Sequence, residues 1–299
     1  MTMARLGLGT AQFGQDYGVS NRGGRPDERE VAAILARAAA AGVGYIDTAP
    51  GYGDAEVLVG RHLPRGHGLR IITKSSALKD ATVQARHGKH LLDTLAGSLE
   101  RLKVDAVHGL LVHQVDDLAK PGWEHLVDAM MEARTRGWVN RIGASIYNAD
   151  QLALVECRFG PQLVQLPLNV LDRRPIVSGT LARLKSADIE IHARSVFLQG
   201  LLLMDPKELP EFFAPVRTKI ANARALWGKR GLGPLDGCLA FALQLPEIDA
   251  VIVGVNSLRE FQQMEQAAAS SADANADIDI GQSVDPIYVD PSRWPGFVH

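Results

Sequence analysis

Four side chains that could act together on a carbonyl group follow three consecutive apolar runs of the sequence. Asp47 and Tyr52 follow the first run, Lys74 ends the second, and His113 ends the third. Addition of a hydride to a carbonyl carbon requires a proton donor beside the developing alkoxide, and a tyrosine can serve although its ordinary pKa is about 10. The Lys74 ammonium would lower the pKa of Tyr52, and Asp47 would keep Lys74 charged. His113 could then orient the carbonyl oxygen.

Each of these residues also has an ordinary structural explanation. Asp47 could cap a helix or form a turn, and Tyr52 could be an ordinary loop aromatic. Lys74 could be a surface charge, and His113 could be a structural histidine. Their joint position on consecutive strand ends favours the chemical role. Lys74 could instead form a Schiff base, as in an aldolase, but a neighbouring carboxylate would keep the amine charged and poorly nucleophilic.

The apolar runs alternate with helical patterns along almost the whole chain. Strands are expected at Leu6–Thr10, Tyr45–Thr48, Leu69–Lys74, Val107–His113, Asn140–Ser145, Gln162–Leu166, Ile189–Ser195 and Ala250–Gly254. Helices are expected at Glu28–Ala41, Lys89–Leu102, Glu124–Arg136, Asp150–Arg158, Pro175–Ala187, Pro215–Lys229, Pro234–Leu245 and Ser257–Ala268. Eight strand–helix units predict an α/β fold, a single-domain (β/α)8 TIM barrel, whose functional residues gather at the carboxyl ends of the strands. An open doubly wound sheet shares this alternation, but no Gly-x-Gly-x-x-Gly opens a helix after the first strand.

Composition excludes several classes of partner. The chain has 299 residues and a formal net charge of −2, so neither nucleic acid nor an anionic membrane is expected to bind it. No apolar run reaches the roughly 18 residues of a membrane span, and no secretory signal is visible, which predicts a cytoplasmic protein. The histidines lack zinc-site spacing, so no metal is expected. We expect a monomer or a small homo-oligomer.

The C-terminal part differs from the rest in composition. Residues 1–268 are assigned to the barrel and residues 269–299 to a tail. The tail begins with small and acidic residues, which predicts partial flexibility, and ends in Pro291–Pro295, where Trp294 is expected to dock on the barrel. Two long loops, Gln15–Pro26 and Val115–Trp123, are expected to select the substrate together with this tail.

The segment Ile46–Gly53, which reads Ile-Asp-Thr-Ala-Pro-Gly-Tyr-Gly, resembles the signature of the aldo-keto reductase family, as found in bacterial members. Lys74 and His113 match the family's other two catalytic positions. The resemblance extends from Gly7 to Gly254. It implies that an aldehyde or ketone, which could be sugar-derived, is reduced with Tyr52 as the proton donor. The hydride would come from NADPH, or alternatively from NADH, bound without a Rossmann fold. The alternative function is a nucleotide-binding regulatory or redox-sensing subunit with little turnover.

The resemblance also implies a set of cofactor-binding residues. These are Gly9, Thr10, Ala11, Ser145, Gln165, Arg194, Ser195, Phe197, Gln199, Gly200, Leu201, Gly254, Val255, Asn256, Ser257, Arg259 and Gln263. Ser145 and Gln165 would hold the nicotinamide carboxamide. The segment from Gly254 to Glu260 would grip the adenosine phosphate at a helix start. The basic residues of strong NADPH binders are not at their usual places, because Glu260 falls near an expected arginine and Arg259 stands beside it.

Arg194 stands where the family usually has an aromatic residue against the nicotinamide. A guanidinium is planar and can also stack on a ring. Arg194 is therefore expected to lie flat against the nicotinamide or to clamp its phosphates. The alternative is an ion pair with a local carboxylate such as Glu190.

Overall fold

The computed structural model is a closed barrel of eight parallel strands in chain order, and it describes residues 3–21, 23–271, 274, 276, 278 and 284–295. The strands are β1 (Leu6–Gly9), β2 (Tyr45–Asp47), β3 (Arg70–Lys74), β4 (Val107–Val112), β5 (Val139–Ser145), β6 (Leu163–Pro167), β7 (Glu190–Arg194) and β8 (Ala250–Gly254). Strand β1 pairs with both β2 and β8, which closes the barrel. The predicted (β/α)8 TIM barrel is confirmed, and the strand bounds lie within a residue of the predicted ones.

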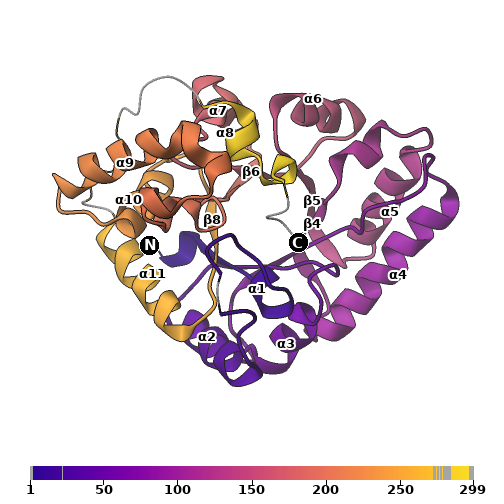
Figure 1. The fold of residues 1–299 in the computed structure, drawn as a ribbon. Coiled ribbons are helices and arrows are strands. Elements are labelled where there is room, and N and C mark those ends of the chain that lie inside the picture. The colour runs from indigo at the N-terminus through magenta and orange to yellow at the C-terminus, as the bar shows by residue number, and fades with distance from the viewer. Residues whose placement is uncertain are drawn as a thin grey trace.

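Helices surround the strands as a ring (Figure 1). The α-helices are α1 (Ala11–Gly14), α2 (Glu28–Ala40), α3 (Ala55–His62), α4 (Ala85–Leu102), α5 (Glu124–Thr135), α6 (Ala149–Arg158), α7 (Arg174–Val177), α8 (Thr180–Ser186), α9 (Ala214–Gly228), α10 (Pro234–Leu243), α11 (Leu258–Ser270) and α12 (Pro286–Val289). The 3-10 helices are η1 (Met3–Arg5), η2 (Val115–Ala119), η3 (Leu201–Leu203), η4 (Pro206–Glu208), η5 (Glu211–Phe213) and η6 (Pro291–Arg293).

Two helix predictions were wrong. The single helix expected at Pro175–Ala187 is two helices, α7 and α8, because Gly179 between them has a φ of 70°, which interrupts the helix. Helix α4 begins at Ala85, earlier than the expected Lys89, because Gln84 and His87 form a capping box at its start. Helix α3 was not predicted.

The barrel interior is filled by large side chains from alternating strand positions. Its buried cluster consists of Tyr45, Ile72, Leu111, Leu163, Ala250 and Ile252, separate from the larger apolar layer between strands and helices. A parallel strand covered on both faces is apolar on both, which is why the strand runs are continuous rather than alternating. Because the interior is packed with side chains, functional residues can lie only at the two ends of the barrel.

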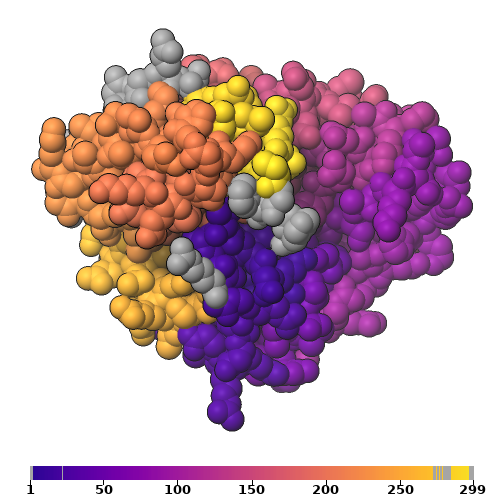
Figure 2. All heavy atoms as spheres, in the orientation of Figure 1, coloured from indigo at the N-terminus to yellow at the C-terminus, as the bar shows by residue number. Residues whose placement is uncertain are grey.

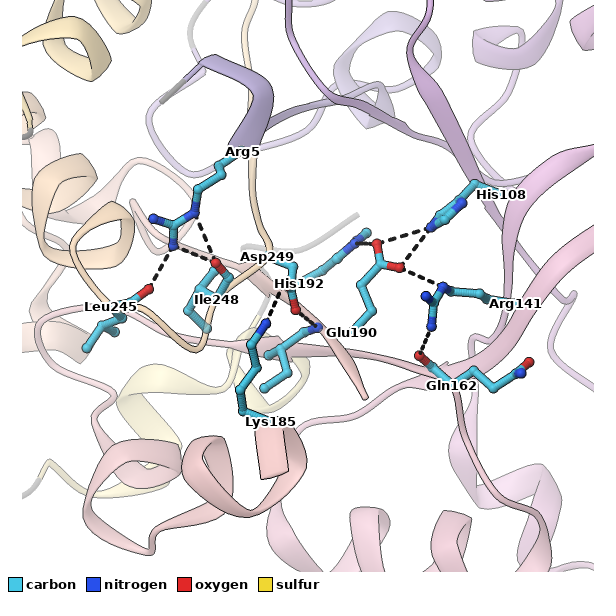
Figure 3. A network of polar contacts seen from close by, with 11 residues as sticks. Arg5, His108, Arg141, Gln162, Lys185, Glu190, His192, Leu245, Ile248 and Asp249 are labelled. Carbon is cyan, nitrogen blue, oxygen red and sulfur yellow. Dashed lines mark hydrogen bonds and ion pairs between the residues drawn. The ribbon is translucent and has the colours of Figure 1, made fainter. Parts of the chain in front are cut away.

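The amino-end of the barrel is closed by a buried charge network around Glu190 (Figure 3). The Glu190 carboxylate lies 2.8 Å from His108 Nε2, 2.8 Å from His192 Nε2 and 3.0 Å from Arg141 Nε. The Tyr45 ring packs edge-on against His192, with 4.6 Å between centroids. Burial alone would raise the pKa of Glu190, but the hydrogen bonds and charges of the two histidines hold it well below its usual range. This end is therefore a structural ion cluster.

The described part of the tail packs on the barrel. The Trp294 side chain is 6% exposed, and its ring lies 4.8 Å from that of Phe213. In Figure 2 residues 284–295, coloured yellow, lie between the orange α9–α10 region and the pink half of the molecule. Much of the stretch expected to be flexible lies outside the described residues, and the division of the chain at residue 268 stays a prediction.

Candidate active site

A buried ion pair joins the ends of β2 and β3. Lys74 Nζ lies 2.7 Å from Asp47 Oδ2 and donates a second hydrogen bond, of 3.0 Å, to the Thr48 carbonyl. Both charged side chains are nearly inaccessible, with Lys74 2% and Asp47 5% exposed. The register of β2 against β3 brings the two residues together, because Asp47 pairs with Ile72 and Lys74 follows two residues later on the same face.

Tyr52 stands over this ion pair on the loop that follows β2. The Lys74 Nζ lies 5.0 Å from the centroid of its ring. The loop is held close to α1, because a Cβ on Gly14 would stand 1.8 Å from the Tyr52 carbonyl oxygen. Gly53, which follows Tyr52 in the loop, has a φ of 55° and also lies close to the Gly14 backbone. Only glycine at position 14 allows this close approach of the two backbone segments.

Burial and charge act in opposite directions on the two proton-bearing groups. Burial raises the pKa of the Tyr52 phenol above its ordinary value, although the Lys74 ammonium acts to lower it. Burial alone would lower the pKa of Lys74, but the Asp47 carboxylate and the Tyr52 phenol hold it above its ordinary value. The expectation of a lowered Tyr52 pKa was wrong, because loss of solvation outweighs the ammonium. Tyr52 is therefore a neutral phenol, and Lys74 is charged, at neutral pH.

His113 faces the same phenol from the end of β4. The His113 and Tyr52 rings meet edge to face with 6.1 Å between centroids. Burial, together with the positive charges of Lys74 and Arg194, lowers the pKa of His113 to about 4. The imidazole is therefore neutral at pH 7 and carries a single ring N–H.

A chain of hydrogen bonds continues from Asp47 across β5, β6 and β7. Gln165 Nε2 donates to Asp47 Oδ1 over 2.8 Å, and Ser145 Oγ donates to Gln165 Oε1 over 3.3 Å. Arg194 Nε donates to Ser145 Oγ over 3.3 Å. Hydrogen bonds thus link Gln165, Ser145 and Arg194, three of the residues expected to bind the cofactor, to the Asp47–Lys74 ion pair.

Arg194 has neutral partners and an aromatic one. Its guanidinium donates to the Ile146 carbonyl and to Ser195 Oγ, and its carbon Cζ lies 4.1 Å from the centroid of the Tyr147 ring. The alternative, an ion pair between Arg194 and Glu190, was wrong. Glu190 lies at the opposite end of β7, in the charge network at the amino-end of the barrel.

One cavity runs along the carboxyl ends of the strands, from Asp47 and Tyr52 to the start of α11. The expected site residues that line it are Gly9, Thr10, Ala11, Asp47, Tyr52, Gln165, Arg194, Ser195, Phe197, Gln199, Gly200, Gly254 and Asn256. Ser145 and His113 line a neighbouring cavity. Leu201 and Val255 are buried in the apolar core, Ser257 caps α11, and Arg259 and Gln263 are exposed. The last five are expected site residues that the structure does not bring to the cavity wall.

The cavity wall after β7 is a strained loop. Ser195, Leu198 and Gln199 have φ values of 59°, 49° and 55°, and Gly200 has a φ of 88°. Asn169 braces this loop, because its Nδ2 donates to the Ser195 carbonyl over 3.1 Å. Left-handed backbone at three non-glycine positions costs free energy and is typical of binding sites.

Two buried acceptors on the cavity have no hydrogen-bond partner in the described part of the chain. They are Gln199 Oε1 and Asn256 Oδ1. A buried polar atom without a partner is costly, so these acceptors suit a ligand that carries hydroxyl or amino groups. These acceptors on the cavity wall therefore suit a polar ligand.

Sequence reasoning missed several residues of the cavity wall. They are Gln12, Tyr17, Gly18, Ser20, Asn21, Val196, Leu203, Ile252 and Val253. Tyr17 lies in the long loop after α1, and its hydroxyl accepts a hydrogen bond from Gln199 Nε2. The unusual length of that loop was the available signal. Among the described residues, no cluster of side chains could hold a metal ion and no helix is long and apolar enough to cross a membrane.

Known proteins resemble the chain in sequence and in fold. The aldo/keto reductase family model matches residues 5–280. The chain is 28% identical over 178 residues to aldo-keto reductase YhdN of Bacillus subtilis, covering 57% of this chain and 51% of YhdN. It is 28% identical over 145 residues to 6-dehydroglucose reductase of Novosphingobium aromaticivorans, covering 45% and 47%. Aldo-keto reductase str7 of Strobilurus tenacellus is 28% identical over 285 residues, covering 88% and 82%.

The match to the first two relatives spans about half of their length. A crystal structure from Pseudomonas aeruginosa, assigned provisionally to the aldo-keto reductases, superimposes with a TM-score of 0.66 at 21% identity and 90% coverage of both chains. That likeness shows the barrel fold alone. The family model, which spans nearly the whole chain, carries the assignment: the chain belongs to the aldo/keto reductase family.

Proposed function

We propose that the protein is an NAD(P)H-dependent carbonyl reductase that converts an aldehyde or ketone into an alcohol. One observation carries the proposal: the buried Lys74–Asp47 ion pair lies beneath the Tyr52 phenol at one end of a long polar cavity. An exposed ion pair is common and has little effect, but a fully desolvated pair is costly unless it is well satisfied. Membership of the aldo/keto reductase family supports the same activity.

Tyr52, Lys74, Asp47 and His113 each have a separate role in the proposed reaction. A bound NAD(P)H supplies the hydride. Tyr52 holds the proton that the developing alkoxide requires, since its raised pKa keeps the phenol protonated at neutral pH. Lys74 stands ready to stabilise the phenolate left after proton transfer, and Asp47 fixes the position of that ammonium. Neutral His113 offers an N–H donor that can orient the carbonyl oxygen.

The substrate is proposed to be rich in hydroxyl groups. The cavity beside His113 is walled by amide and carboxylate side chains, among them Gln114, Asn148, Gln151 and Asp290. The amides both donate and accept hydrogen bonds and the carboxylates accept them, which suits a polyhydroxylated carbonyl compound better than an apolar one. A sugar-derived substrate fits this wall, and one relative is named a 6-dehydroglucose reductase.

The experiment is reduction of an aldehyde and aldose panel with NADH and with NADPH, using wild-type protein and Tyr52→Phe. The substitution keeps the ring and removes the proton, so turnover should fall by about 10²- to 10⁴-fold with little change in cofactor affinity. Tyr288→Phe, the same chemical change in the tail, is the matched control and should retain wild-type turnover. Wild-type turnover by Tyr52→Phe would refute the assignment of the donor.

Two other outcomes would replace the proposal. Binding of nucleotide without turnover of any carbonyl compound would indicate the regulatory alternative. Trapping of a substrate on Lys74 by borohydride would indicate a Schiff-base aldolase. The raised pKa of Lys74 opposes the latter, because a charged ammonium is not a nucleophile.

A further inference from the structure

The cavity proposed for the cofactor ends at the first turn of α11. Asn256 and Glu260 line this end, and Tyr52 and Asp47 line the catalytic end. A dinucleotide that presents its nicotinamide to Tyr52 must therefore direct its adenosine half toward α11. The chemistry of this helix start decides which adenosine ribose fits: NADPH carries a phosphate on the 2′-oxygen, whereas NADH carries a hydroxyl.

The first turn of α11 already holds carboxylates on its backbone N–H groups. Glu260 Oε2 accepts from the Asn256 N–H over 2.7 Å, and Glu30 Oε1, from α2, accepts from the Leu258 N–H over 2.5 Å. The Glu260 N–H donates to Ser257 Oγ over 3.1 Å. The first N–H groups of a helix normally form a ready anion site. Here the protein's own acidic and hydroxyl side chains satisfy them.

The charge at the cavity wall is also negative. Arg259, the one basic residue in the first turn of α11, and Glu260 are both exposed, but only Glu260 lines the cavity. The nearby Asn256 Oδ1 is a further acceptor and has no partner among the described residues. A phosphate dianion brings only acceptors and negative charge to such a wall. A ribose hydroxyl brings a donor.

We propose that this end of the cavity selects NADH over NADPH, with Glu260 accepting a hydrogen bond from the ribose 2′-hydroxyl and with Glu260 and Glu30 together repelling a 2′-phosphate. Acidic side chains serve the same purpose in another dinucleotide-binding fold, where arginine replaces them for the phosphorylated cofactor. The inference rests on the proposed function, and it reverses the order in which the sequence placed the two cofactors.

Equilibrium binding tests the inference without turnover. NADH and NADPH are titrated into the full chain, and each Kd is measured by calorimetry. Like charges brought together at an interface disfavour binding strongly, so NADH should bind at least about tenfold more tightly than NADPH. Raising the salt concentration screens the repulsion, so the ratio of the NADPH Kd to the NADH Kd should fall.

Three variants locate the effect. Glu260→Gln keeps an oxygen that can accept from the Asn256 N–H, so the cap is retained while the charge is lost. It should tighten NADPH binding about threefold to tenfold, because the repulsion is removed, and weaken NADH binding about threefold, because the ribose hydroxyl loses its charged acceptor. Glu30→Gln should act in the same direction. Glu100→Gln, an exposed glutamate on α4 on the far side of the barrel from α11, is the matched control and should leave the ratio unchanged (Figure 1).

Several outcomes would overturn the inference. They are equal or tighter binding of NADPH by the wild-type protein, an unchanged Kd ratio in Glu260→Gln, and a selective loss of NADPH affinity in Arg259→Ala, which would mean that the arginine holds the phosphate. These results leave the proposed function intact if Tyr52 remains essential for turnover. Failure of both dinucleotides to bind would remove the proposed function as well.

Discussion

His113 should make the stability of the protein depend on pH. Burial and the charges of Lys74 and Arg194 lower its pKa to about 4 in the folded state, whereas a histidine in an unfolded chain titrates near 6.5. The folded pKa is depressed, so the unfolded state binds more protons between these two values, and stability must fall as the pH is lowered through that window. Above the window the histidine is neutral in both states and makes no difference.

The size of this effect follows from the two pKa values. From pH 7 to pH 5, the shift to about 4 implies a loss of about 2 kcal/mol of unfolding free energy from this one residue. His113→Asn keeps a polar side chain but cannot take up a proton in this range. The variant should therefore lose about 2 kcal/mol less than the wild-type protein between the two pH values.

Urea unfolding followed by circular dichroism at pH 7 and at pH 5 measures the difference. Any change that the substitution makes in packing is present at both pH values and cancels in the comparison. His125→Asn, on the exposed side of α5, should keep the wild-type pH dependence and controls for loss of a histidine. Equal pH dependence in wild-type protein and His113→Asn would refute the lowered pKa of His113 and the reasoning from its burial.

Two further predictions concern the ion pairs at the two ends of the barrel. Lys74→Met and Asp47→Asn should each suppress turnover. Because the two residues act as a unit, kcat of the double variant should be little lower than that of the slower single variant. Losses in kcat that multiply in the double variant would contradict this. Glu190→Gln should lower the unfolding free energy by about 1–3 kcal/mol, because the neutral amide cannot satisfy His108, His192 and Arg141 as the carboxylate does. Glu208→Gln, an exposed glutamate of η4, should change it little. Urea midpoints at constant slope measure both, and equal midpoints would show that the Glu190 network does not stabilise the fold.

The sequence predicted the barrel and the proximity of Asp47, Tyr52, Lys74 and His113 because both depend on local pattern. Strands buried on both faces are apolar throughout, so eight such runs could be found without knowing their partners. Parallel strands place their carboxyl ends together, so polar residues that follow the runs at Asp47, Lys74 and His113 had to meet. The helix break at Gly179 was missed because an isolated glycine in a helical pattern is often tolerated.

The remaining features depend on contacts between segments that are distant in the sequence. Glu30 and Leu258 are joined by a hydrogen bond across 228 positions, so no local pattern could assign Glu30 to the start of α11. The pKa of Tyr52 was predicted in the wrong direction for the same reason. The Lys74 ammonium could be inferred from the order of the strands, but the loss of solvation that outweighs it depends on how the surrounding loops close over the phenol.

The polar chain across the strand ends suggests how the site can be rigid and still bind a carboxamide. Asp47 Oδ2 accepts from Lys74, which leaves Oδ1 to accept from Gln165 Nε2. Gln165 Oε1 then accepts from Ser145, whose oxygen accepts from Arg194. From Arg194 to Gln165, each residue donates a hydrogen bond to the next one toward Asp47. The orientation of the Gln165 amide is therefore fixed. A glutamine has two N–H donors and two acceptor sites, and this chain uses one of each. Gln165 thus keeps one donor and one acceptor for the cavity that it lines, and these are the complement of the carbonyl and amino groups of a primary amide such as the nicotinamide carboxamide.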